Sequence, residues 1–286
     1  ADTLIGGDGG DVLIQRATLV NGAAGSLLDG GAGNDQITFD ANQAYISDYV
    51  RIYGGEGDDQ IQAATAQSQY VGSIQIDGGG GDDVIEVGHV EGSQGGLGYI
   101  DGGEGNDLIR VLDSWGFGNG IWGNSKFQLL GGAGNDRFDL AGNQINVLGS
   151  DQGAQLDGGA GFDALVWNGQ YNLVVNGQQN PALELHSGYE RELKTSNIES
   201  VSLAGTGASG LTLKFSAQDV ETITSGSDFD QTTLGLGLTG IGNTLFLAME
   251  ANFIDLSEWS PLGSVVVHGL HYEFYQSELA YLGLIF

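Results

Sequence analysis

The chain has 286 residues, of which 52 are Gly, 2 are Pro and none is Cys. Its 37 acidic residues against 8 Lys and Arg give a net charge of −29, which argues against nucleic acid or an anionic membrane surface as a partner and suits a protein that binds cations. Without Cys, neither a disulfide nor a thiolate metal site can form. No run of about 18 apolar residues predicts a membrane span. No signal peptide opens the chain, and residues 1–5 resemble the tail of a repeat, so we expect a fragment of a longer protein.

A six-residue motif, Gly-Gly-x-Gly-x-Asp, occurs seven times from the N-terminus onward. The first glycines of the copies are Gly6, Gly30, Gly54, Gly78, Gly102, Gly131 and Gly158. The interval from one first glycine to the next is constant from Gly6 to Gly102, and it is slightly longer in the last two steps. A repeated period of this length is typical of a solenoid, in which each repeat forms one coil stacked on the previous one.

Apolar residues flank each turn with a period of two. Two residues before the glycines stand Leu4, Leu28, Ile52, Ile76, Ile100, Leu129 and Leu156, and two residues after the Asp stand Leu13, Ile37, Ile61, Ile85, Ile109, Phe138 and Leu165. This alternation predicts one strand entering the turn and another leaving it, with apolar side chains pointing inward. One hairpin cannot bury its own apolar face, whereas stacked coils can. We therefore predict an all-β fold over residues 1–167, a right-handed parallel β-solenoid with coils of about 24 residues.

The last position of every motif is an Asp, and these carboxylates are candidate calcium ligands: Asp11, Asp35, Asp59, Asp83, Asp107, Asp136 and Asp163. Coils stacked about 4.8 Å apart would form a column of like charges, each neighbouring pair repelling by roughly 1 kcal/mol in water and by more at lower dielectric. The neighbouring acids Asp58 and Asp82 add to this repulsion. Glycines leave carbonyl oxygens unshielded, and carbonyl and carboxylate oxygens are the ligands that calcium prefers.

A single copy of this motif would favour a simpler interpretation, a tight turn with a solvated Asp. Seven copies in near-constant register favour several calcium ions, about one in each gap between turns. The rest of each coil holds no second motif, so we expect one metal column along one edge. The sequence thus predicts a fold that is ordered with calcium and disordered without it.

These seven copies closely resemble the calcium-binding nonapeptide repeats of RTX proteins, which are secreted by Gram-negative bacteria and form parallel β-rolls. The resemblance implies a secreted or cell-surface location, type I secretion machinery as a partner, and folding by extracellular calcium. It also implies that turn carbonyls complete the metal shell, near Gly6, Asp8, Gly30, Ala32, Gly54, Glu56, Gly78, Gly80, Gly102, Glu104, Gly131, Ala133, Gly158 and Ala160. Tandem nonapeptides make shorter coils with calcium on both edges, and the last copy carries Phe162 where the others have Asn, Asp or Gly, so we expect this turn to end the array.

Residues 168–286 are predicted to form a β-rich C-terminal cap that covers the last coil. Candidate strands are 173–175, 198–203, 211–215, 244–248, 264–267 and 272–275. Residues 198–203 are expected to extend the solenoid by coils that bind no calcium, and residues 218–223 suggest a helical turn. The order of features resembles the C-terminal end of large RTX adhesins, at Gly159–Asp163, Ser196–Glu199, Leu203–Gly207, Asp219–Val220, Trp259, Gly263–Val267 and Tyr272–Tyr275. Residues 279–286 are either part of an export signal or a final strand.

Other chemistry is poorly supported by the sequence. None of the four His residues has a recognised metal-ligand spacing, and no nucleophile elbow occurs, so we expect no enzymatic activity. Residues 114–122 lengthen one coil and carry Trp115 and Trp122, which either pack beneath this loop or bind a glycan or a surface. The leading hypothesis is a calcium-dependent structural module of a secreted adhesin. The alternatives are the C-terminal RTX tail of a secreted lipase, protease or epimerase, and a glycan-binding or surface-binding module.

Overall fold

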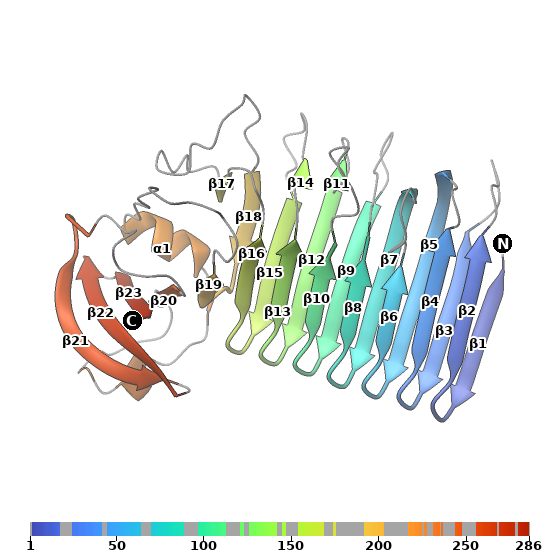
Figure 1. Cartoon of the computed structure of the whole chain (residues 1–286), viewed down its shortest axis with the longest axis horizontal. Coiled ribbons are helices and arrows are strands. Elements are labelled where there is room, and N and C mark those ends of the chain that lie inside the picture. The colour runs from blue at the N-terminus through green and yellow to red at the C-terminus, as the bar shows by residue number, and fades with distance from the viewer. Residues whose placement is uncertain are drawn as a thin grey trace.

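The protein is built from two long β-sheets that face each other along most of the chain (Figure 1). The computed structural model describes residues 2–17, 25–41, 45–63, 70–88, 97–112, 121–122, 126–141, 145–146, 154–168, 174–175, 192–202, 217–224, 226–227, 231–234, 236, 244–247, 256–267, 269–277 and 280–285.

The first sheet has nine strands and the second has twelve. In spatial order, the nine strands are β1 (Thr3–Asp8), β3 (Ser26–Ala32), β5 (Tyr45–Glu56), β7 (Tyr70–Gly80), β9 (Leu97–Glu104), β12 (Lys126–Ala133), β15 (Ala154–Ala160), β18 (Glu192–Ser196) and β17 (Val174–Val175). The twelve are β2 (Val12–Ala17), β4 (Gln36–Ala41), β6 (Gln60–Ala63), β8 (Val84–Val87), β10 (Leu108–Val111), β13 (Arg137–Ala141), β16 (Ala164–Asn168), β19 (Ser200–Ser202), β20 (Thr244–Leu247), β23 (Ala280–Ile285), β22 (Leu270–Ser277) and β21 (Ser260–Val267). A small pair, β11 (Ile121–Trp122) with β14 (Ile145–Asn146), stands apart from both.

Equivalent positions of successive repeats pair in register, which confirms the predicted parallel solenoid with coils of about 24 residues. Leu28 pairs with Ile52, and Ile52 pairs with Ile76 in the next coil. On the other side of the turn, Ile37 pairs with Ile61 in the same way. All strands from β1 to β20 pair in parallel, while β22 pairs antiparallel with both β21 and β23. The seven glycine turns consequently lie side by side along one edge, the lower edge in Figure 1.

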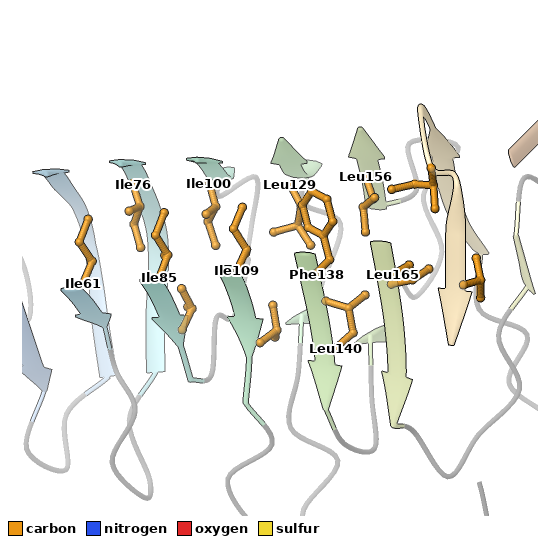
Figure 2. Close-up of a cluster of buried hydrophobic side chains, with 14 of the residues drawn as sticks. Ile61, Ile76, Ile85, Ile100, Ile109, Leu129, Phe138, Leu140, Leu156 and Leu165 are labelled. Atoms are coloured by element: carbon orange, nitrogen blue, oxygen red, sulfur yellow. The ribbon is translucent and has the colours of Figure 1, made fainter. Parts of the chain in front are cut away.

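The core is a continuous column of branched side chains between the two sheets. Figure 2 shows side chains from the two sheets facing each other, such as Ile76 with Ile85 and Ile100 with Ile109. All four are fully buried. This confirms the inward direction that the period-two pattern predicted. The exception is Gln15 in the first coil, which is buried and donates a hydrogen bond to Ser26 (2.8 Å).

The solenoid continues beyond residue 167 into an eighth coil. β18 pairs in parallel with β15, and β19 pairs in parallel with β16. The strand predicted at residues 198–203 is therefore present as Ser200–Ser202 and extends the solenoid. The predicted strand at 173–175 is present as Val174–Val175, and those at 244–248, 264–267 and 272–275 fall in β20, β21 and β22. Residues 211–215 lie outside the described part of the chain.

A small cap closes the C-terminal end of the stack (Figure 1). The predicted helical turn is part of α1 (Ala217–Ile223), and a 3-10 helix, η2 (Gln231–Leu234), follows it. Of the two interpretations of the last residues, the structure bears out a final strand, β23, which pairs with β20. Export by this segment stays a prediction. Within the described residues, no helix has the length and apolar character needed to cross a membrane.

Aromatic side chains hold the cap to the last motif turn. Phe246 makes edge contacts with Tyr272 and Phe274, with ring centroids 5.0 and 5.6 Å apart. Phe162, which stands where the other turns have Asn, Asp or Gly, also contacts the ring of Phe246, with ring centroids 5.2 Å apart. Phe162 was the reason to expect that the seventh turn ends the row of motif turns. Its ring lies where the cap begins.

Candidate metal-binding column at the turns

Each turn is made possible by two glycines with positive φ, at the second and fourth positions of the motif. In the third coil these are Gly55 (φ 115°) and Gly57 (φ 117°). Residues other than glycine rarely adopt a backbone conformation with positive φ. A Cβ added to Gly55 would also collide with the backbone carbonyl of Gly31 in the preceding coil. Successive turns thus stack backbone against backbone, and this brings the motif aspartates into one column.

The aspartate side chains point into the turns rather than into solvent. Six of them are at most 1% exposed: Asp35, Asp59, Asp83, Asp107, Asp136 and Asp163. Asp11, in the first coil, is partly exposed. One carboxylate oxygen of each buried Asp, Oδ1, accepts a hydrogen bond from the backbone N–H of the Asp in the preceding coil, at 2.7–2.8 Å. The predicted column is therefore present, and its members are directly connected.

The second carboxylate oxygen faces a backbone carbonyl of the next coil. A Cβ added to Gly30 would meet Oδ2 of Asp35 and the carbonyl oxygen of Gly54 at once. The same pair, a motif Oδ2 and the carbonyl of the next first glycine, lies beside Gly6, Gly54, Gly78, Gly102 and Gly131. Oδ2 is buried without a hydrogen-bond partner in Asp11, Asp35, Asp59, Asp83, Asp107 and Asp136. Two acceptor oxygens that face one space without a donor repel each other unless a cation or a proton lies between them.

The third-position carbonyls have a different environment. The N–H of Gly33 donates to the carbonyl of Glu56 (2.6 Å), and the N–H of Gly57 donates to that of Gly80 (2.6 Å). The same bond recurs at Ala32, Glu104, Ala133 and Ala160. Each of these carbonyls retains a second lone pair. First-position carbonyls are thus placed directly beside the carboxylates, whereas third-position carbonyls also hold neighbouring coils together.

Burial and neighbouring carboxylates disfavour ionisation of the aspartates in the column. Burial raises the pKa of Asp59 and Asp136 to about 6 and that of Asp83 and Asp107 to about 7. The backbone hydrogen bond at each carboxylate lowers its pKa, but neighbouring carboxylates raise it again, as Asp107 and Asp59 do for Asp83. Asp58 also raises the pKa of Asp59, in line with the predicted repulsion. Ionised carboxylates in this column therefore need a compensating charge.

A second ladder, which the sequence analysis missed, runs along the outside of the turns at the fifth motif position. Oδ1 of Asp58 accepts a hydrogen bond from the N–H of Asp82 (2.9 Å), and Oδ1 of Asp82 accepts one from the N–H of Asn106 (2.7 Å). In the last step of this ladder, Oδ1 of Asn135 accepts a hydrogen bond from the N–H of Phe162 (2.9 Å). The side chain here bonds to the following coil, whereas the buried Asp bonds to the preceding one. The recurrence of Asn and Asp at this position was the available signal.

The residues present fit a hard cation such as calcium. Each gap offers carboxylate and carbonyl oxygens, which suit calcium's flexible coordination by oxygen. No three His, Cys, Asp or Glu side chains cluster as a metal site within the described ranges, because each turn contributes one buried carboxylate and the remaining donors are backbone carbonyls. The loop carrying Trp115 lies outside the described residues, as do His89, His186 and His268, while His271 is exposed on β22.

Comparison with protein families, with curated proteins and with solved structures finds no match for this chain.

Proposed function

We propose that this chain is a calcium-dependent folding and structural module of a secreted or cell-surface bacterial protein, as its resemblance to RTX proteins implies. The observation that carries the proposal is the repeated pair of oxygens in the gaps between turns, a buried Oδ2 that accepts no hydrogen bond and a carbonyl of the next coil. Calcium in these gaps would join neighbouring coils through the same atoms that repel without it.

The chain's own residues would act as follows. The stacked turns orient one carboxylate and one first-position carbonyl into each gap, and the backbone N–H of the preceding Asp fixes the carboxylate through Oδ1. Calcium would supply the positive charge that compensates the buried carboxylates. Because the sites form only when coils stack, binding free energy becomes folding free energy.

This coupling suggests a physiological cycle. In a calcium-poor cytosol the charged column would oppose folding, and the unfolded chain would remain competent for a type I exporter. Outside the cell, calcium would order the coils and make export irreversible. The resemblance of residues 159–275 to RTX adhesins favours a parent adhesin; the same module could serve as the tail of a secreted enzyme.

Calcium binding by two aspartate variants tests the proposal. Asp83 borders two gaps, because Oδ2 faces the Gly102 carbonyl and Oδ1 bonds to the N–H of Asp59 in the preceding coil. Asp11 belongs to the first coil and borders one. We therefore expect Asp83→Ala to lower calcium affinity, measured by isothermal titration calorimetry, about tenfold or more. Asp11→Ala should lower it less.

The control is Glu104→Ala, which removes the same charge from an exposed side chain of a turn. It should leave the affinity close to that of the unmodified chain. Equal effects of the three substitutions would indicate that calcium responds only to net charge, and the stacked column would then be wrong as the binding site.

A further inference from the structure

The eighth turn of the solenoid lacks the glycine motif and is only half as long as the seventh. Asp157 pairs with Ser196 and Ala164 pairs with Ser200, so residues 158–163 of the seventh coil are matched by Asn197, Ile198 and Glu199 alone. Asn197 has φ 52° and is the one non-glycine residue with positive φ in the described part of the chain. Asn tolerates this left-handed conformation better than most residues, so a three-residue turn can replace the glycine turn.

Glu199 takes the place of the motif Asp. Its side chain is 1% exposed, and Oε2 accepts a hydrogen bond from the N–H of Asp163 at 2.7 Å. Asp163 accepts the equivalent bond from the N–H of Asp136 at 2.8 Å. The extra methylene of Glu extends the carboxylate from the shortened turn to the position that Asp reaches elsewhere.

The carbonyl of Asn197 takes the place of the carbonyl of the first glycine. A Cβ added to Gly158 would meet this carbonyl oxygen and Oδ2 of Asp163 together. One coil earlier, a Cβ added to Gly131 would meet the Gly158 carbonyl and Oδ2 of Asp136 in the same way. The motif count gives seven turns and six gaps, but the arrangement of oxygens is repeated in a seventh.

We propose that the gap between the seventh and eighth turns is a further calcium site, formed by Asp163, the Asn197 carbonyl and Glu199. This inference rests on the proposed function of the other gaps. The shortened turn lacks the third-position carbonyl of the motif turns, so this site has fewer backbone donors and binds calcium more weakly than the gaps in mid-column.

The position of this site connects the column to the cap. The carbonyl of Glu199 accepts a hydrogen bond from the N–H of Phe246 in β20 (2.7 Å), and Nδ2 of Asn197 donates to Oδ1 of Asp157 (2.5 Å). Oδ1 of Asn197 is buried and occupies the space that a Cβ at Gly226, just beyond α1, would fill. The eighth turn therefore contacts both β20 and the end of α1, and calcium in this gap would fix the position of that turn.

The number of bound calcium ions tests the inference. Native mass spectrometry of the whole chain at saturating calcium is compared for the unmodified protein, Glu199→Gln and the control Glu221→Gln, which makes the same change on α1. Glutamine keeps an oxygen that can accept the N–H of Asp163 but removes the charge. We expect Glu199→Gln to bind one ion fewer than the unmodified protein, and Glu221→Gln to bind the same number.

An unchanged ion count in Glu199→Gln overturns the seventh site while leaving the proposed function intact. If the unmodified protein binds no calcium, the proposed function itself is wrong. Should Glu199→Gln fail to reach the native far-UV circular dichroism spectrum, Glu199→Asp decides, because its side chain keeps the charge but is one methylene shorter. Loss of one ion in Glu199→Asp supports the site, and an unchanged count rejects it.

Discussion

Replacing Asp83 with Asn should stabilise the calcium-free protein and weaken the calcium-bound one. In the fold, Oδ1 of Asp83 accepts the N–H of Asp59 at 2.8 Å, and the amide oxygen of Asn can keep this bond. The amide N–H₂ of Asn would then face the carbonyl of Gly102, where Asp83 presents a second acceptor. The substitution thus replaces a buried repulsion with a hydrogen bond, but it removes a charged ligand.

The size of the effect follows from the ionisation of Asp83. Burial raises its pKa from 3.8 to about 7, which corresponds to about 4 kcal/mol against the ionised form in the fold. This value is an upper bound for the gain, because the carboxylates of the column titrate together. We expect Asp83→Asn to stabilise the calcium-free protein by about 2–4 kcal/mol above pH 7.

The same reasoning fixes the pH dependence. The folded pKa of Asp83 lies above the unfolded value, so the folded state binds more protons, and the wild-type, calcium-free protein loses stability as the pH rises from about 4 to about 7. Asn does not titrate. The advantage of Asp83→Asn should therefore be present at pH 8 and disappear near pH 4.

The assay is folding in a calcium chelator, driven by sucrose and followed by far-UV circular dichroism, since this osmolyte favours burial and carries no charge at either pH. The control is Glu104→Gln, which replaces a carboxylate with an amide on an exposed side chain of a neighbouring turn. If Asp83→Asn needs as much osmolyte as the control at pH 8, the buried column is not what opposes folding.

Three further substitutions test the stacking and the cap in the calcium-saturated protein. Gly55→Ala and Gly7→Ala both strain a positive φ, by about 1–2 kcal/mol, but only at Gly55 does the added Cβ meet the backbone of another coil, so Gly55→Ala should cost about 1–3 kcal/mol more in urea denaturation. Equal costs would contradict close stacking of the turns. Phe162→Asn restores the residue type of other turns but removes the ring from Phe246, and should lower the free energy of unfolding by about 1–3 kcal/mol. An unchanged melting temperature would show that this ring does not hold the cap.

The repeated part of the fold was predictable because each coil carries the same local information. Glycines at fixed positions specify the turn, and alternating residues such as Ile76 and Ile85 specify which face is buried. The register between coils then follows from equal spacing. The candidate ligand column was predictable for the same reason, since seven aspartates at one turn position must share one edge.

The extension of the solenoid at residues 198–203 was predicted, but the likeness of the eighth turn to the motif turns was not, because its sequence does not resemble the motif. Glu199 follows Asp163 by 36 residues, its turn has three residues instead of six, and its carboxylate belongs to a different residue type. Its equivalence to the other turns is visible only in the strand pairing and in the hydrogen bond to Asp163, which form in the tertiary structure. The cluster of Phe162, Phe246 and Tyr272 was hidden likewise, because its members are far apart in sequence.

The central claim is that calcium and the solenoid form together, and a calcium titration of the whole chain tests it most directly. Far-UV circular dichroism should show little β structure in chelator and a cooperative gain of β structure as calcium is added, with no comparable gain at equal magnesium, which dehydrates reluctantly and demands octahedral geometry. The melting temperature should rise with calcium concentration. If the chelated protein instead shows the same β content and melting temperature as the calcium-saturated protein, the aspartate column is not a calcium switch.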